Sequence, residues 1–528
     1  MTATPSVVAR PDVDRRWWIL AVLAVAQLMI VVDASIVNIA LPHAQRALHI
    51  TTANRQWVIT AYTLTFGGLL LLGGRIADFM GRKRVLLVGL LGFAGASALG
   101  GLAPDASLLF AARALQGGFA ALMAPAALSL LTVTFTDPRE RARAFGVWGA
   151  IAGGGLALGL ILGGVLTQYA SWRWCLLVNT PIALVAGVAA FRLIPESRVT
   201  GHTRYDIPGA LTSTLGMVTL VYGVTKASTN GWGSSSTLGL LGVAVALLVA
   251  FVVIERSSTH PLLPLRVITD RNRGGSFLTT LLVGLGMFGT FLFLTYYLQG
   301  TLHYSALKTG FAYLPFSLGV VAGATAASQL ILRFRPRAVM GLGLAGAVLG
   351  VLWFSRIGVH SGYWSHLFPA ELIMSLGMGM VFVPVNNTAL TGVSSADAGV
   401  ASALINTTQQ IGGSIGTALL NTIATSVTAT YLVTHGIAGG VAKAASTAVA
   451  GSAAGTRTAA TVAAGTVHGF SVAFIFAAGF LALALVAVTV LVTSKAASGT
   501  SPVPLGEGVS DAGEAGEAGD VGVVLLPT

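Results

Sequence analysis

Long runs of apolar residues, one after another along most of the chain, are the feature that most constrains this fold. Each run has roughly 18 to 25 residues, which as a helix rising ~1.5 Å per residue crosses the ~30 Å hydrocarbon core of a bilayer. A membrane β-barrel would instead show alternating strands of about ten residues. With 54% hydrophobic and 9% charged residues and a mean hydropathy of +0.81, the sequence predicts an all-α polytopic membrane protein.

Fourteen runs can be marked, and each is interpreted as one transmembrane helix. They cover residues 17–41, 56–73, 84–103, 107–135, 143–167, 172–194, 206–226, 237–255, 275–299, 309–332, 338–355, 367–391, 400–430 and 469–493. An even number of spans places both chain ends on the same side of the membrane. The first run continues without a cleavage site, so we expect it to be retained as a helix and not removed as a signal peptide.

The basic residues predict which side that is. The loops on the side of the N-terminus carry 21 of the 30 Lys and Arg residues, and the opposite loops carry 8. By the positive-inside rule both termini are expected in the cytoplasm. The formal net charge of +12 is thus explained by topology. No soluble domain offers a basic face, so we expect no nucleic-acid partner.

Two faint internal repeats predict the domain organisation. Residues 81–92 resemble 333–346, and residues 117–125 resemble 376–384, both at an offset of eight runs. We therefore expect a cytoplasmic N-terminus (1–16), a six-helix bundle (17–200), two inserted helices (201–260) and a second six-helix bundle (261–495). The second bundle contains an outer loop at about 431–468, and residues 496–528, acidic and rich in glycine, are expected to form a disordered cytoplasmic tail.

A buried ion pair is the most specific site hypothesis. Asp33 lies eight residues, or ~12 Å, from the outer end of the first run, and Arg113 lies six residues, or ~9 Å, from the outer end of the fourth. A carboxylate in a membrane helix costs about 2.5–3.5 kcal/mol, so Asp33 should face a cavity and be paired or protonated. Movement of Asp33 relative to Arg113 would couple proton affinity to conformation. The alternative is a static pair that fixes two helices.

Other polar residues within the runs are weaker candidates. Asn38, Gln116 and Asn386 either line a central cavity or form hydrogen bonds between helices, as do Asn387, Asn406, Gln409 and Gln410. Glu371 is a candidate for proton coupling or substrate binding, but it lies about four residues from the outer end of its run. At that depth we expect a hydrated, interfacial glutamate.

Glycine patterns mark two further places. Gly155, Gly159 and Gly163 recur at four-residue spacing beside Gly164 in the fifth run, a pattern that predicts close helix packing. The stretch "GGRIADFMGRKRVLLVG" (73–89) contains Gly74, Asp78, Gly81 and Arg82 in a short basic turn. Asp78 can meet a neighbouring helix N-terminus or a cation and so latch two bundles together. Alternatively, the turn only sets the topology.

Several motifs resemble one family. "GRIADFMGRKR" resembles the signature loop of the major facilitator superfamily, G-x-L-A-D-x-x-G-R-K-x, with Ile76 in the leucine position. "VDASIVNIALP" (32–42), "RALQGG" (113–118), "WRWCLLVNTPIAL" (172–184) and "ASALINTTQQIGGSIGTAL" (401–419) resemble its fourteen-helix drug:proton antiporter branch. The glycines of the fifth run resemble the antiporter motif G-x-x-x-G-P-x-x-G-G, but Leu160 stands in the proline position.

This resemblance implies a fold and a function. The fold is two six-helix bundles plus two central helices, and the function is proton-coupled efflux of drug-like or antibiotic compounds by alternating access. In the family the arginine at the position of Arg113 is associated with proton coupling. The expected substrate is a small amphipathic compound, with cations favoured by Asp33, and the expected form is a monomer in the cytoplasmic membrane of a bacterium. The alternative is a symporter or uniporter of a small nutrient or metabolite.

Missing motifs exclude other classes. No lysine follows a glycine, so there is no P-loop for ATP. The nine histidines form no HExxH or similar pair, and no Gly-x-Ser-x-Gly elbow occurs. We therefore expect no metal, no cofactor other than the proton gradient as energy source, and no enzymatic activity.

Overall fold

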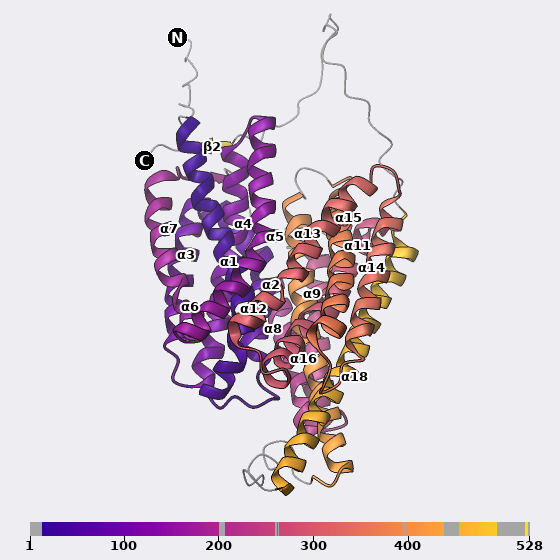
Figure 1. Ribbon diagram of the computed structural model, residues 1–528. Helices are drawn as coiled ribbons and strands as arrows, with labels where there is room; N and C mark the ends of the chain where they lie inside the picture. The colour runs from indigo at the N-terminus through magenta and orange to yellow at the C-terminus, as the bar shows by residue number, and fades with distance from the viewer. Residues whose placement is uncertain are drawn as a thin grey trace, which may run out of the picture.

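The computed structural model describes residues 13–199, 206–258, 261, 263, 265–393, 398–437, 453–493 and 523–525. These residues form two groups of packed helices that lie side by side with their axes roughly parallel (Figure 1). We call the end of the molecule where α1 begins the proximal end, and the opposite end, which holds the α1–α2, α3–α4 and α5–α6 connections, the distal end.

The first half of the chain and the inserted segment contain α1 to α9. Their bounds are α1 Val13–Ala47, α2 Trp57–Met80, α3 Arg82–Gly101, α4 Ala106–Thr134, α5 Pro138–Tyr169, α6 Trp174–Leu177, α7 Asn179–Leu193, α8 Ile207–Asn230 and α9 Ser235–Ser257. Strand β1, Ser197–Val199, follows α7 and pairs antiparallel with β2, Val523–Leu525.

The second half contains α10 to α18. Their bounds are α10 Leu265–Thr269, α11 Arg271–Tyr296, the π-helix η1 Tyr297–Thr301, α12 Ala306–Ala312, α13 Leu314–Leu330, α14 Pro336–Phe354, the π-helix η2 Tyr363–Leu367, α15 Phe368–Leu390, α16 Ala398–Thr434 and α18 Ala453–Leu491. The tenth apolar run is therefore split into α12 and α13 at Tyr313.

Short polar side chains begin several of these helices. The side chains of six N-cap residues accept backbone N–H groups of the first turn, which would otherwise lack partners. They are Asp105, Asp137, Asp206, Ser234, Asp270 and Ser305. At the exposed start of α5, the backbone N–H groups of Glu140 and Arg139 hold the pKa of Asp137 below its usual range.

The two halves repeat the same pattern of helix packing. In the first half α2 packs on α4, α3 on α4 and α7, and α1 on α5. In the second half α13 packs on α15, α14 on α15 and α18, and α11 on α16. Each of these pairs is shifted by eight apolar runs, the same offset as the sequence repeats.

The halves meet at the distal end. One buried apolar cluster joins the distal parts of the first half, such as Ile36, Ile59 and Leu176, to the core of the second half around Phe293. A separate cluster fills the first half nearer the proximal end, around Leu86 and Phe93. Helix α2 crosses to α16, and α5 crosses to α12 and α13. The shared core therefore closes the molecule at its distal end.

Each of the fourteen predicted runs corresponds to helix, and the prediction of an all-α polytopic fold is confirmed. In the described part of the chain, twelve helices are long and apolar enough to cross a membrane. Among the described helices of 18 residues or more, those outside that set are α5, of which residues 154–169 count as a shorter apolar segment, and α16. The number of fourteen spans remains a prediction.

The predicted domain limits are only partly covered by the structure. Residues 1–12, 200–205, 438–452 and 494–522 lie outside the described residues, and with them the N-terminal segment, most of the predicted disordered tail and part of the predicted outer loop. On either side of residues 438–452, that loop is occupied by the ends of α16 and α18.

Candidate functional site: a buried carboxylate–guanidinium network

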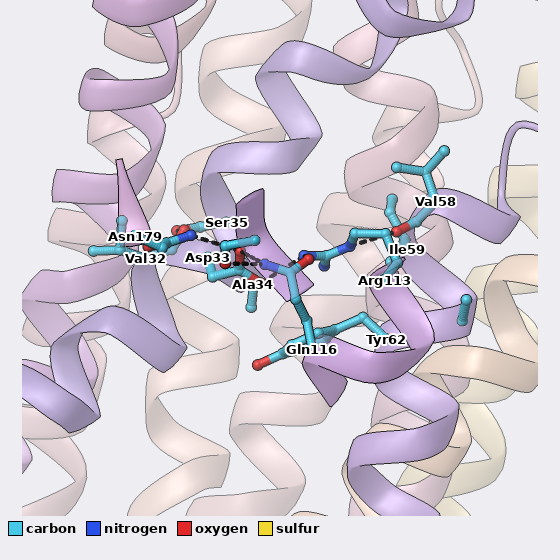
Figure 2. Close-up of polar contacts among 12 residues, drawn as sticks. Val32, Asp33, Ala34, Ser35, Val58, Ile59, Tyr62, Arg113, Gln116 and Asn179 are labelled. Carbon is cyan, nitrogen blue, oxygen red and sulfur yellow. Dashed lines mark hydrogen bonds and ion pairs between the residues drawn. The ribbon is translucent and has the colours of Figure 1, made fainter. Parts of the chain in front are cut away.

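Asp33 and Arg113 form an ion pair in the middle of the first half. Arg113 Nη1 donates to Asp33 Oδ2 at 2.6 Å. The other carboxylate oxygen, Oδ1, accepts from Gln116 Nε2 at 3.1 Å and from Asn179 Nδ2 at 2.9 Å. Figure 2 shows these side chains converging from α1, α4 and α7. The predicted pairing of the first and fourth runs is therefore present in the structure.

The guanidinium group is also held by α2. Arg113 Nε donates to the carbonyl oxygen of Val58 at 2.9 Å, and its guanidinium carbon lies 4.4 Å from the centre of the Tyr62 ring (Figure 2). Arg113 Nη1 also donates to Gln116 Oε1 at 2.9 Å, and Gln116 Nε2 donates to Ser97 Oγ of α3 at 2.6 Å. Five helices thus meet at one polar centre.

This centre is closed to solvent. Asp33 is 0% exposed and Arg113 1% exposed. Removing each ion from water costs several kcal/mol, which the pair offsets only because its oxygens and N–H groups are matched by further hydrogen bonds. Nearby, the Tyr62 hydroxyl and the side-chain amide oxygen of Asn179 are buried and have no hydrogen-bond partner among the described residues. The carboxylate oxygens of Asp33 are therefore fully paired, whereas these two polar atoms at the edge of the network are not.

Asn179, Ser97 and Tyr62 were missed by the sequence analysis. Asn179 carried a signal, because it is the only amide side chain in the sixth apolar run. Ser97 and Tyr62 carried none, since serine and tyrosine are ordinary residues of membrane helices.

The remaining polar candidates lie outside this network. Asn38 donates to the carbonyl oxygen of Ala34 in its own helix at 3.2 Å. Asn386 donates to Phe382 of its own helix at 2.6 Å. It lines a cavity of ≈ 80 Å³ between α11, α15 and α16, together with Asn406 and Gln409. Of the two roles expected for Asn386, this position agrees with the lining of a cavity.

Glu371 corrects one expectation. It was expected to be hydrated at the membrane interface, but it is 1% exposed. The reason is tertiary: Tyr363 of η2 covers it, and its hydroxyl lies 3.3 Å from Glu371 Oε2. Position along a helix gives depth in the membrane but not the neighbours that exclude water.

The basic turn between α2 and α3 is held by a residue that the sequence analysis did not select. Gly81 has a φ of +99°, which favours glycine, and a Cβ there would lie 2.5 Å from Glu196 Oε1. Glu196 accepts from the backbone N–H of Lys83 at 3.1 Å and pairs with Arg84 at 3.5 Å. The carboxylate after α7 therefore caps α3.

The other predicted latch residues are less informative. Gly74 faces α4, where an added Cβ would lie 3.6 Å from Pro125 Cβ. Arg82 is half-buried at the start of α3. The side chain of Asp78 lies outside the described part of the structure, so its role as a latch stays a prediction.

The glycines of α5 connect the network to the second half. Gly155, Gly159 and Gly163 pack against Val31, Ser35 and Ile36 of α1, on either side of Asp33 along the chain. Gly164 packs against the second half instead, because an added Cβ would lie 2.8 Å from the Cα of Leu307 in α12. These glycines therefore lie at close helix contacts, which tie α1 to α5 and α5 to the other half.

Leu160, which stands in the proline position of the antiporter motif, is buried at the same crossing. Its carbonyl oxygen lies 2.6 Å from where a Cβ of Gly310 in α12 would be. The crossing is therefore made by backbone atoms of both halves. The side chains that the structure describes include no group of three or more His, Cys, Asp or Glu that could hold a metal ion.

Comparisons with known proteins agree with this architecture. The sequence profile described as Major Facilitator Superfamily matches residues 23–417. The "Puromycin resistance protein pur8" of Streptomyces alboniger is 51% identical over 423 residues, covering 79% of this chain and 84% of that protein. The "Cephamycin export protein CmcT" of Amycolatopsis lactamdurans is 38% identical, covering 78% and 85%.

Solved structures show the same fold. A bacterial homologue of the human lysosomal transporter Spinster, in an inward-facing and unoccupied conformation, aligns with a TM-score of 0.62 and 15% identity. The alignment covers 91% of this chain and 98% of that one.

Proposed function

This chain belongs to the Major Facilitator Superfamily, and on that basis we propose that it exports antibiotic or other drug-like compounds in exchange for protons. As a member of that family it is a multi-pass membrane transporter and not an enzyme. The observation that carries the proposal is the Asp33–Arg113 pair, buried at the meeting point of five helices. Export of this class of substrate is supported by the puromycin and cephamycin proteins to which the chain is similar.

The proposed orientation places the proximal end in the cytoplasm. Both termini are then cytoplasmic, in agreement with the excess of Lys and Arg on that side. The distal contact between the halves becomes the closed outer side of the transporter. In alternating access, this contact opens to release substrate outside and closes to allow loading from the cytoplasm.

Proton coupling works through the partners of Asp33. A proton on the carboxylate removes its charge, so the attraction to Arg113 falls and the guanidinium group is left to Gln116 and the carbonyl of Val58. Asp33 belongs to α1 and Arg113 to α4, while α1 is packed on α5 through glycines. A change at the pair is therefore transmitted to α5, which contacts the other half through Gly164.

The proposed substrate is a small amphipathic molecule. The cavity between α11, α15 and α16 combines apolar side chains such as Phe382 with the amides of Asn386, Asn406 and Gln409. Such a lining matches a compound with apolar surface and several hydrogen-bonding groups. A cationic substrate is favoured by Asp33 only when the network opens, because the carboxylate is fully buried as described. We propose that the monomer suffices for transport.

The test is efflux of puromycin and of a lipophilic cation such as ethidium from cells that express the wild type, Asp33→Asn or Asp105→Asn. Asp105→Asn is the matched control, because Asn also serves as an N-cap at the exposed start of α4. We expect wild-type and Asp105→Asn efflux to collapse with a protonophore, and Asp33→Asn to be inactive without it. Protonophore-resistant efflux contradicts proton coupling.

The alternative of a nutrient symporter or uniporter is tested by direction. In inverted membrane vesicles with an acidic interior, an antiporter accumulates substrate inside, whereas a symporter expels it. Accumulation that requires the imposed gradient supports the export proposal, and its reversal supports symport.

A further inference from the structure

A second buried carboxyl group lies in the other half of the protein. Glu371 sits in the first turn of α15 and is 1% exposed. In the described part of the chain no ion pair includes it, and its Oε1 atom has no hydrogen-bond partner. Asp33 is matched by a guanidinium and two amides, but Glu371 has no such partners. A charged carboxylate that is buried without a cation is strongly disfavoured, and this cost favours the protonated, neutral form of the Glu371 side chain.

The distances around the Tyr363 hydroxyl bear on the protonation state of Glu371. Tyr363 Oη lies 2.7 Å from the carbonyl oxygen of Ala312 and 3.3 Å from Glu371 Oε2. A tyrosine hydroxyl has one proton to donate. A carbonyl oxygen can only accept, so the shorter contact uses that proton. That proton can reach Glu371 Oε2 only as the longer and weaker arm of a shared hydrogen bond, whereas a protonated carboxyl group can donate its own proton to Tyr363 Oη.

The other groups around Glu371 do not supply a positive charge. Tyr313, between α12 and α13, faces it and is engaged with Thr295 and the carbonyl of Phe291. The backbone N–H of Phe316, in the first turn of α13, points toward the carboxyl group, but it offers a dipole and not a full positive charge. Lys308 of α12 is exposed and lies 3.8 Å over the Tyr304 ring. Among the described residues, the titratable side chains that face Glu371 are thus Tyr363 and Tyr313.

The same residues adjoin the distal contact between the halves. Ala312, whose carbonyl oxygen accepts the hydrogen bond from Tyr363, is two residues from Gly310, where α12 touches the backbone of α5 at Leu160. Separation of α5 from α12 would displace Ala312 and admit water to Glu371. Tyr363 could then turn its hydroxyl to a charged carboxylate.

We propose that Glu371 is a second proton-binding site, which takes up a proton from the outer side when the α5–α12 contact is open and holds it while the contact is closed. A hydronium ion on the outer side gives up its proton and leaves as water, the carboxylate of Glu371 takes the proton, and the Tyr363 hydroxyl moves its hydrogen bond from the carboxylate to the Ala312 carbonyl. Closure of the outer side then requires protonation of Glu371. This inference rests on the proposed proton-coupled export, because it assigns the closing step of that cycle to an outer proton.

The first test measures opening of the contact without transport. Replacement of the single, buried cysteine by Cys175→Ala gives a background for a reporter, Leu307→Cys, at a position whose backbone packs against Gly164 across the contact. We expect labelling by a membrane-impermeant maleimide, corrected for thiol ionisation with an exposed reporter, to fall as the outer pH is lowered. The limit for one titrating proton is about tenfold per pH unit.

Variants separate Glu371 from other groups. Glu371→Gln, which imitates the protonated acid, is expected to give low labelling that no longer depends on pH. Tyr363→Phe removes the acceptor of the Glu371 proton, so the protonated form is less stable and closure should need a lower pH. Asp105→Asn, an exposed carboxylate on the same side, should keep the wild-type dependence. Unchanged pH dependence in Glu371→Gln overturns the proposal.

The second test observes the proton directly. Infrared difference spectra of the purified protein, recorded across a pH step, should contain the carbonyl stretch of a neutral carboxylic acid that is absent in Glu371→Gln. If this band persists in the variant, Glu371 is not the proton carrier. Neither test needs a substrate or a gradient. Proton-driven efflux together with unchanged pH dependence of labelling in Glu371→Gln would therefore refute only the role of Glu371. Failed efflux together with a Glu371-dependent band would refute only the export proposal.

Discussion

The Asp33–Arg113 pair should behave as one energetic unit. Arg113→Met removes the cation and leaves the 0%-exposed Asp33 with only Gln116 and Asn179 as donors. Breaking a buried pair in this way costs about 3–5 kcal/mol, because one charge stays buried without compensation. Asp33→Asn strands the guanidinium instead and should cost a similar amount. The double variant removes both charges, so it should be more stable than either single variant.

The measurement is a double-mutant cycle on unfolding in mixed micelles of detergent. We expect a coupling energy near the upper end of the usual range, about 2–3 kcal/mol. The chain offers a matched control in Arg16–Glu140, a pair of 2.8 Å whose side chains are 15% and 26% exposed. Water screens this pair, and its coupling should be about 0–1 kcal/mol. Equal couplings for the two pairs, or additive effects at Asp33 and Arg113, would refute the reasoning.

Three further predictions concern packing and polar contacts. Gly159→Ala should abolish transport and lower thermal stability, because its Cβ would overlap Ser35 and Val32 of α1, whereas Gly154→Ala, with nothing within 4 Å, should be silent in both assays. Gly81→Ala should lower the melting temperature more than Gly231→Ala, since both glycines have positive φ but only Gly81 is crowded, by Glu196. Asn421→Ala removes the acceptor of Arg55 at 3.0 Å and should destabilise the closed distal contact by about 1–3 kcal/mol, which is measured as faster labelling of the Leu307→Cys reporter.

The sequence allowed the helices and the central ion pair to be predicted because both depend on local properties. A run of apolar residues specifies a membrane helix by length alone. Asp33 and Arg113 stand out as charges in such runs, and counting residues from the helix ends gives each a depth. Two charges at equal depth in neighbouring helices have few other partners. The glycine spacing in α5 is local in the same sense.

The remaining parts of the site depend on contacts between distant segments. Glu371 is buried because the π-helix η2 brings Tyr363 over it and α12 supplies the Ala312 carbonyl. No pattern near Glu371 reveals either neighbour. Likewise, Glu196 caps α3 from more than a hundred residues away. Such residues look ordinary in sequence and acquire their role only from tertiary packing.

The inserted helices α8 and α9 differ in their relation to the distal contact. Arg55 is 5% exposed, donates to Asn421 of α16 and lies 4.0 Å over the Tyr296 ring of α11. Asn421 donates to Gln56 at 2.8 Å, and Gln56 donates to Thr225 of α8 at 3.3 Å.

Helix α8 therefore belongs to the hydrogen-bonded layer that joins the two halves. By contrast, only 11% of the apolar span of α9 is buried, and its main contact is α8. Opening the distal contact must break bonds to α8 as well as those between the bundles, because Thr422 of α16 also donates to the Val224 carbonyl at 3.1 Å. An unpaired buried guanidinium group is costly, so Arg55 should keep its hydrogen bond to Asn421 until water can hydrate the guanidinium group. Helix α8 thus adds hydrogen bonds that stabilise the closed distal contact, and α9 packs along α8 without joining that contact.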